Sequence, residues 1–167
     1  MENNELLAKC LELASAIAKP FEGLHKLVHN EIFAYHDHVG YPTIGYGHLL
    51  SLIKMENLAK YPKMTFLTAE QQLQKDMLQA ATRAIKLSPI LGREENLGRW
   101  AAITDFCFNC GDGNYSKSSL RRAVNNEDWY EAANQVQYWN KASGRVLAGL
   151  TKRRKAEALL LVYKGAK

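Results

Sequence analysis

Cysteine is scarce in this sequence, with three residues among 167. Cys10, Cys107 and Cys110 form an odd, sparse set, which argues against a disulfide framework and favours synthesis in a reducing compartment. Long apolar runs are also missing, since no segment approaches the roughly 18 apolar residues that a membrane-spanning helix requires. The first residues, MENNELL, carry acids and amides where a secretion signal carries lysines. We therefore expect neither a membrane span nor a signal peptide.

The charge of the chain is unbalanced, because 22 Lys and Arg oppose 17 Asp and Glu and give a formal net charge of +5. A basic surface attracts polyanions, so nucleic acid, an acidic glycan and an anionic membrane are all open as partners. Hydrophobic residues make up 47% of the chain. At this length they are enough to fill a core without disulfides or metal ions, and we expect one globular domain.

Helical periodicity dominates the chain. Apolar residues three and four apart predict an amphipathic helix from about Asn4 to Ala18, and Pro20 and Gly23 both favour its ending nearby. Thr68 with Gln71 fits a capping box at the start of a long helix. Further helices are expected over residues 68–87, 97–110, 118–124, 127–140 and 149–163.

One stretch of the N-terminal half has the pattern of strands instead. Tyr35, Asp37 and Val39 alternate with their neighbours, and residues 43–46 are strand-like residues that follow turn-forming glycine and proline. This pattern predicts a small antiparallel hairpin, followed over residues 49–63 by a loop with a short helix. The expected fold class is therefore α+β and mostly helical, with the sheet confined to one end.

Three oxygen-bearing side chains surround the predicted hairpin: Glu22, Asp37 and Thr43. A glycosidase needs one protonated group for the departing sugar oxygen and one anionic group that activates water or stabilises positive charge. Glu22 suits the acid role at a helix end, because the negative end of the helix dipole disfavours a second negative charge. Asp37, in a turn, is expected to stay ionised. The ordered set, rather than any one residue, indicates a carboxylate-based hydrolase.

Longer motifs extend this set over nearly the whole chain. The most specific is GYPTIGYGHLL at residues 40–50. It is accompanied by FEG at 21–23, AYHD at 34–37, LTAEQQLQKD at 67–76, FCFNCGDGNYSKSSLRR at 106–122, YW at 138–139 and GRVLAGLTKRRKAEALL at 144–160. With these motifs the sequence resembles the phage-type lysozymes, the endolysins with which bacteriophages cut host peptidoglycan.

The resemblance implies a lysozyme-like fold in a single catalytic domain of residues 1–167. Its parts would be an N-terminal helix and hairpin lobe over about residues 1–67, a connecting helix over about 68–87, and a helical lobe over about 88–167. The protein would act as a monomer. It would accumulate in the host cytoplasm and reach peptidoglycan after a separate protein has opened the membrane.

The resemblance also implies the reaction, which is hydrolysis of the β-1,4 bond between N-acetylmuramic acid and N-acetylglucosamine with inversion at the anomeric carbon. Glu22 would protonate the leaving oxygen, while Asp37 and Thr43 would hold and activate water on the opposite face. No metal ion and no organic cofactor are implied.

More residues separate Glu22 from Asp37 than separate the matching residues in the familiar members of that family, so the segment HKLVHNEIFAYH contains an insertion. Glu31 lies inside the insertion and is a rival for the acid role. We assign the role to Glu22 because it alone has the FEG context at a helix end, whereas Glu31 lacks a following glycine.

Other positions resemble residues that support the family's active site. Those that match saccharide contacts are Leu49, Phe108, Ser119 and Asn134. His48 and Asp76 match a structural ion pair of some members, so His48 is expected to support the hairpin rather than to take part in catalysis.

A metal site is an open alternative, because the chain has five histidines. His25 and His29 are spaced as on one helix face, and His36 and His38 flank Asp37. A zinc site usually offers a cleaner set of three or four ligands. The C-x-x-C pair of residues 107–110 has no second pair, so its cysteines are expected to be small core residues.

The C-terminal segment of residues 145–167 contains KRRK and allows two interpretations. In the first, a terminal helix packs Leu159, Leu160 and Val162 on the core and leaves a solvated basic face. In the second, a cationic amphipathic helix binds the anionic surface of a Gram-negative outer membrane.

Two rival functions remain open from the sequence. A lytic transglycosylase needs one acid and no water-activating aspartate. A non-catalytic nucleic-acid-binding protein would use the basic C-terminal helix, but it leaves Glu22, Asp37 and Thr43 unexplained.

Overall fold

The computed structural model describes residues 2–163, and the chain divides into two units. The helical unit comprises the chain up to Phe21 and from Met77 onward, and the sheet unit is Glu22–Asp76. The predicted lobes grouped the first helix with the hairpin, whereas the structure groups it with the later helices. The reason is its apolar face: Cys10 is fully buried, and its Sγ lies 3.6 Å from Thr104 Oγ1.

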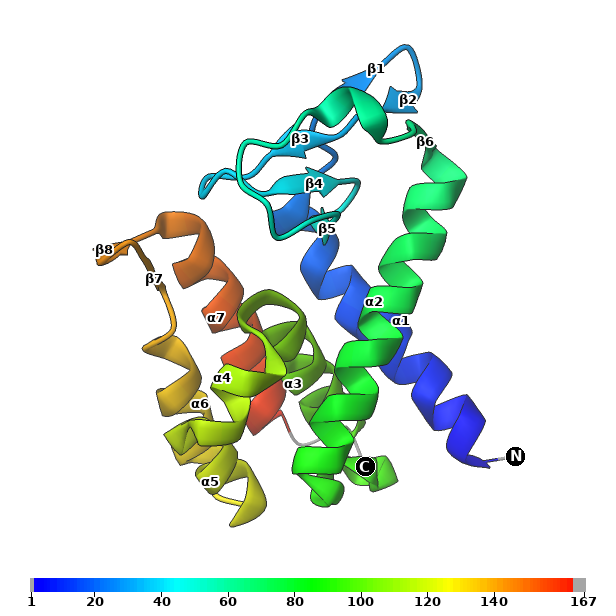
Figure 1. Cartoon of the computed structure of the whole chain (residues 1–167). Helices are drawn as coiled ribbons and strands as arrows, with labels where there is room; N and C mark the ends of the chain where they lie inside the picture. Colours follow the sequence, from blue (N-terminus) through cyan, green and yellow to red (C-terminus); the bar gives the residue numbers. More distant parts are fainter. Residues whose placement is uncertain (1, 164–167) are drawn as a thin grey trace. The chain divides into compact units, whose positions relative to one another are not determined.

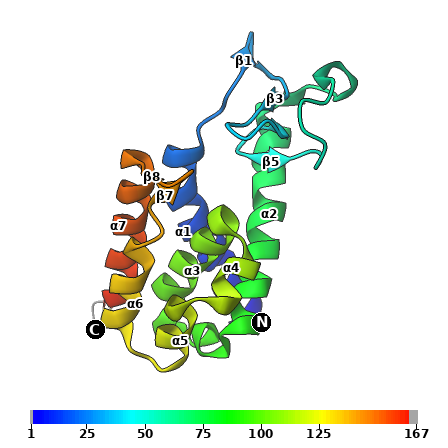
Figure 2. The same ribbon diagram turned by 60° about the vertical axis from the view of Figure 1, so that its left-hand side comes forward.

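The helical unit holds most of α1 (Glu2–Glu22), the second half of α2 (Phe66–Leu87) and every later helix. The later elements are the 3-10 helices η2 (Pro89–Gly92) and η3 (Glu94–Asn96), then α3 (Leu97–Cys110), α4 (Asp112–Lys117), α5 (Ser119–Asn125), α6 (Trp129–Gln137) and α7 (Ala148–Val162). α7 packs against α6 and α3 (Figures 1 and 2). The helix predicted over residues 97–110 is confirmed, and its residues from Trp100 to Cys107 are all buried.

Two helix ends differ from the prediction. α1 continues through Pro20 and ends at Glu22, before Gly23 takes a φ of +61°. α2 begins at Phe66, and its cap is a reciprocal pair in which Thr68 N donates to Thr65 Oγ1 (3.2 Å) and Thr65 N donates to Thr68 Oγ1 (2.9 Å). The predicted Thr68–Gln71 box is wrong because the helix starts directly after a strand that ends at Thr65.

The predicted basic face of the last helix is also wrong in part. Arg153 and Arg154 are 2% and 0% exposed, whereas Leu159, predicted to lie in the core, is 69% exposed. Helical spacing places both arginines on the same face as the buried Glu157 and Leu161. Residues 164–167 of the segment lie outside the described residues.

A buried carboxylate on the neighbouring helix explains how these cations are accommodated. Arg153 donates from Nε to Asp105 Oδ2 (2.9 Å) and from Nη2 to Asp105 Oδ1 (2.7 Å). Arg154 Nη2 lies 2.7 Å from Glu157 Oε1 and also donates to Asn109 Oδ1 (3.1 Å). Burial, and then a hydrogen bond with Asp105, raise the pKa of Glu157. The described part of α7 is therefore a core helix with an internal charge cluster.

The sheet unit contains two small antiparallel sheets of three strands each (Figure 1). One has the order β3 (Tyr35–His36), β4 (Pro42–Ile44) and β5 (His48–Leu49), and extends the predicted hairpin by a strand. The other has the order β1 (Leu27–Val28), β2 (Glu31–Ile32) and β6 (Met64–Thr65). The short 3-10 helix η1 (Leu58–Lys60) lies between β5 and β6 in the chain.

The hairpin of β1 and β2 in the second sheet lies in the segment that was predicted to contain an insertion. Val28 pairs with Glu31, so His29 and Asn30 make a two-residue turn, with φ values of +48° and +64°. Positive φ at both positions is the signature of a type I′ hairpin turn. A hairpin of β7 (Lys141–Ala142) and β8 (Arg145–Val146) in the helical unit was not predicted.

The predicted fold class is confirmed, since the chain is mostly helical with small antiparallel sheets. Among the helices of residues 2–163, none combines the length and apolar character needed to cross a bilayer.

Candidate active site

One face of the β3-β4-β5 sheet carries a row of three side chains. Tyr35 lies opposite Thr43, and Thr43 lies opposite Leu49. Directly opposed residues share a face, so alternation puts Ile44 and His48 on the other one. Thr43 is 5% exposed, and its hydroxyl donates to the carbonyl of Tyr41 at 3.1 Å.

Asp37 follows β3 in the turn that leads to β4. Its Oδ1 accepts hydrogen bonds from the backbone N–H groups of Val39 and Tyr41, both at 2.8 Å. Burial raises the pKa of Asp37, but the N–H groups of Tyr41, Val39 and Gly40 outweigh it and hold this pKa below its ordinary value of 3.8. The carboxylate is therefore ionised at neutral pH. Its stabilising hydrogen bonds are lost only as the pH falls through this lowered pKa.

Glu22, the last residue of α1, reaches the turn between β4 and β5. A Cβ added to Gly47 would lie 3.1 Å from Glu22 Oε2, so the carboxyl group lies directly against the backbone of this turn. Gly47 has a φ of +83°, a conformation that other residues rarely adopt. The tight turn thus gives the carboxyl group of Glu22 a fixed place beside the sheet.

Tyr35 is the residue that connects these groups, and it is not among the site residues predicted from the sequence. Burial, and then the negative charges of Glu22 and Asp37, raise the pKa of Tyr35 to about 12. Its phenol is therefore within electrostatic range of both carboxylates, and its cross-strand partner is Thr43. Tyr35 thus pairs across the strands with Thr43 and is influenced by the charges of both Glu22 and Asp37. The available signal was its position two residues before Asp37, which predicts the same face of a strand.

Replacing Gly47 by alanine is expected to lower activity about tenfold or more, because the new methyl group displaces the carboxyl group of Glu22. The positive φ should also cost about 1–2 kcal/mol of unfolding free energy. Hydrolysis rates and urea unfolding of the purified variant measure the two effects.

Gly111→Ala is the matched control for this substitution. Gly111 has a φ of +85° with no atom within 4 Å of the added Cβ, so it should lose similar stability and keep its activity. Equal activity in the two variants would contradict the placement of Glu22.

His48 lies on the opposite face of the sheet. Its Nδ1 is 2.9 Å from Asp76 Oδ2, and Gln72 Nε2 donates to Asp76 Oδ1 at 2.9 Å. These contacts tie β5 to α2 within the sheet unit, and they lie on the side away from Thr43.

The rival carboxylate Glu31 lies in the other sheet, on β2. It is opposite Thr65 of β6, and its Oε1 pairs with the ammonium group of Lys63 at 2.5 Å. The carboxylate of Glu31 is therefore paired with Lys63 in this sheet, whereas Tyr35 and Thr43 lie in the β3-β4-β5 sheet.

The four residues predicted to contact saccharide are distributed over both units. Leu49 ends the row on the sheet and is 45% exposed. Phe108, Ser119 and Asn134 lie on α3, α5 and α6 of the helical unit. Asn134 lines a cavity of about 400 Å³ with Gln135, Gln137 and Tyr138. Amide groups and an aromatic ring are groups that can hydrogen-bond and stack on a sugar.

His36 and His25 have other partners in the structure. His36 Nε2 lies 3.0 Å from the carbonyl oxygen of Glu56, and the ring of His25 is 5.0 Å from that of Tyr35. Within residues 2–163, no three or more His, Cys, Asp and Glu side chains are grouped as a metal ion would require. Cys107 is 5% exposed, and Cys110 Sγ accepts a hydrogen bond from Arg154 at 3.0 Å.

Comparison with known proteins adds independent findings. Residues 19–157 match the family model described as phage lysozyme. The chain is 30% identical over 146 residues to an endolysin of Bacillus phage B103, covering 87% of this chain and 51% of that protein. It is 33% identical over 125 residues to a SAR-endolysin of Bacteriophage PS34, covering 74% and 69%. The chain thus spans about half the length of the Bacillus phage relative.

A solved structure supports the same relationship. The chain is similar to the muramidase domain of SpmX from Asticaccaulis excentricus, with a TM-score of 0.69 and 27% identity. The match covers 92% of this chain and 95% of that domain.

Proposed function

Because the chain belongs to the phage lysozyme family, we propose that it is an endolysin that hydrolyses the β-1,4 bond between N-acetylmuramic acid and N-acetylglucosamine of peptidoglycan. The observation that carries this proposal is the grouping of Glu22, Asp37 and Thr43 around Tyr35 within one unit. This is the pair of carboxyl groups with a hydroxyl group that glycoside hydrolysis requires.

In the proposed mechanism Glu22 is the general acid that protonates the departing sugar oxygen. The carboxyl group of Glu22 lies against Gly47, so the position from which it would donate the proton is fixed.

Asp37 is the proposed general base. The backbone N–H groups that lower its pKa keep it anionic and fix Oδ1 in the turn. Together with the hydroxyl group of Thr43 it would position a water molecule for attack on the anomeric carbon. Attack from the side opposite the leaving group inverts the configuration, so the β-bond would give an α-anomer as the first product.

Product analysis on purified peptidoglycan tests this proposal. We expect new reducing ends that are first released as the α-anomer, detected by NMR, and we expect Asp37→Asn to lack activity. An anhydro sugar at the product end, with activity retained in Asp37→Asn, would instead identify a lytic transglycosylase. Loss of activity with a chelator would support a metal-dependent reaction.

Peptidoglycan is the partner that follows from this function. Accumulation in the host cytoplasm, release by a separate membrane-opening protein and a monomeric state stay predictions. Binding of residues 145–167 to an anionic outer membrane also stays a prediction, but it has less support from the structure. The burial of Arg153 and Arg154 leaves Arg145, Lys152 and Lys155 as the exposed cations of its described part. The same burial weakens the nucleic-acid alternative.

A further inference from the structure

The turn of residues 37–41, which carries the proposed base, is held from outside by a second segment of the same unit. The backbone N–H group of Met55 donates to the carbonyl oxygen of Gly40 at 2.9 Å. The ring Nε2 of His36 donates to the carbonyl oxygen of Glu56 at 3.0 Å. Two adjacent residues of the segment therefore contact the chain on both sides of the proposed base.

Met55 has a backbone conformation that few residues other than glycine adopt, with a φ of +53°. Its side chain is 72% exposed, so core packing does not account for this conformation. In it, the backbone N–H group reaches the carbonyl oxygen of Gly40. Strained residues persist only where the surrounding contacts hold them, and they cluster at functional sites. The neighbouring contacts must therefore hold Met55 against this strain.

Burial of apolar side chains contributes little to these contacts. Leu52 and Ile53 are largely exposed, and none of the three residues of η1 is buried. A segment with few buried apolar contacts opens easily unless polar contacts fix it. The conformation of residues 51–61 therefore depends on hydrogen bonds and ion pairs.

Glu56 is the residue at which these polar contacts meet. Its carboxylate is paired with Lys60 and accepts a hydrogen bond from the hydroxyl group of Tyr61 at 2.5 Å. Hydrogen bonds from Lys60, Tyr61 and Ser51 lower the pKa of Glu56 to about 2, so this carboxylate is ionised at neutral pH. Its side chain thus joins residues that precede and follow it, while its carbonyl oxygen accepts from His36.

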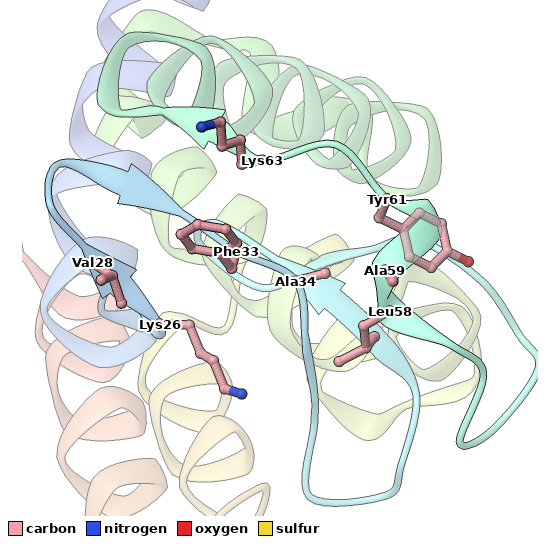
Figure 3. Close-up of a pocket in the computed structure, with 8 residues that line it drawn as sticks. All are labelled: Lys26, Val28, Phe33, Ala34, Leu58, Ala59, Tyr61 and Lys63. Atoms are coloured by element: carbon pink, nitrogen blue, oxygen red, sulfur yellow. The ribbon is translucent and has the colours of Figure 1, made fainter.

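The residues that follow Glu56 also lie beside the start of β3. Ala34, directly before this strand, lines a cavity of about 540 Å³ together with Leu58, Ala59 and Tyr61 (Figure 3). Tyr61 is the residue whose hydroxyl group donates to Glu56. The segment that Glu56 organises therefore runs beside β3 as well as beside the turn that follows it.

We propose that Glu56 is a positioning residue for Asp37 and acts by shaping the segment that holds the turn of residues 37–41. The proposal rests on the proposed function, in which Asp37 is the general base. The turn fixes this carboxylate through the N–H groups of Val39 and Tyr41, each 2.8 Å from Oδ1. A turn that is held less firmly would present these donors less well, which would change both the direction of the carboxylate and its affinity for protons.

Glu56→Gln tests the proposal, because the amide keeps the size of the side chain but cannot form an ion pair with Lys60. We expect kcat on purified peptidoglycan to fall about tenfold and KM to stay within about twofold, because a displaced base slows the reaction without removing a substrate contact. Glu31→Gln is the matched control, since it makes the same change at the ion pair with Lys63 in the other sheet. Its kcat should stay within about twofold of wild type.

The pKa of Asp37, measured by NMR titration of its carboxyl carbon, separates positioning from a general loss of stability. We expect Glu56→Gln to raise this pKa by about 0.5–1, the change that corresponds to weakening one hydrogen bond. Loss of the negative charge of Glu56 would by itself lower this pKa, so a rise identifies weaker N–H contacts. The other titratable groups around the turn are the same in both proteins: Glu22, Tyr35, His36, His38 and Lys54.

Tyr61→Phe is a second variant, and it changes no charge. It removes one donor to the carboxylate of Glu56, so kcat should fall and the pKa of Asp37 should rise, both by less than in Glu56→Gln. If Glu56→Gln does not fold, these two measurements on Tyr61→Phe decide the question.

Two results on folded Glu56→Gln would overturn the inference: a pKa of Asp37 that is unchanged or lowered, or a kcat within twofold of wild type. If the wild-type protein does not cleave peptidoglycan, the proposed function fails. The NMR titration then still decides whether Glu56 positions Asp37, because it needs no substrate.

Discussion

Replacing Glu22 by glutamine is expected to lower the rate of peptidoglycan hydrolysis by about a thousandfold, within the range of 10²–10⁴ that a general acid contributes. The amide keeps the size of the side chain and its place against Gly47, but it has no acidic proton to deliver to the leaving oxygen. Clearing of chloroform-permeabilised Gram-negative cells, followed by turbidity, gives the first measurement. The kcat on purified peptidoglycan gives the second.

Glu31→Gln is the matched control, because it makes the same chemical change on the neighbouring sheet. It removes the ion pair with Lys63, in which both side chains are partly exposed at 39% and 55%, and such pairs contribute about 1 kcal/mol or less. Activity should therefore stay within about twofold of wild type. An inactive Glu31→Gln beside an active Glu22→Gln would reverse the assignment of the acid.

Replacing Asp105 by asparagine is expected to lower the unfolding free energy by about 3–5 kcal/mol, because it leaves the guanidinium group of Arg153 buried without its counter-charge. The two side chains are 0% and 2% exposed and are joined by two hydrogen bonds. Burial raises the pKa of Glu157, the other carboxyl group of this cluster, and favours its neutral form in the native protein. Urea unfolding at pH 7 measures the difference.

Asp112→Asn provides the comparison at the surface of the same helical unit. Asp112 pairs with Arg83 at 2.8 Å, but their side chains are 39% and 50% exposed. Solvent screening should limit its loss to about 1 kcal/mol or less. If both variants lose the same stability, burial does not determine the contribution of the Asp105–Arg153 pair.

The contrast between these two aspartates shows what a sequence can reveal about charge. KRRK in residues 152–155 has the composition of a solvated basic face, and Lys152 and Lys155 are indeed exposed. Whether an arginine in that run is buried depends on a carboxylate 48 residues away in the chain, Asp105. A pattern within one helix contains no information about that partner.

The candidate site also contains residues that the sequence identified and a residue whose role only the folded chain shows. Glu22, Asp37 and Thr43 were identified from residue type, order and the motif context around them, all of which are local properties. Tyr35 was missed because its importance comes from two carboxylates that approach it from different elements.

By itself the sequence determined the helices with clear apolar periodicity, the turn-rich hairpin, the fold class and the set of catalytic candidates. These features depend on interactions between residues a few positions apart, and such interactions leave a pattern in the chain. The tertiary structure alone decided the pairing of the insertion with β6, the burial of Arg153 and Arg154, and the position of Glu22 against Gly47. Each of these depends on contacts between distant segments, whose free energy is gained only when the chain has folded.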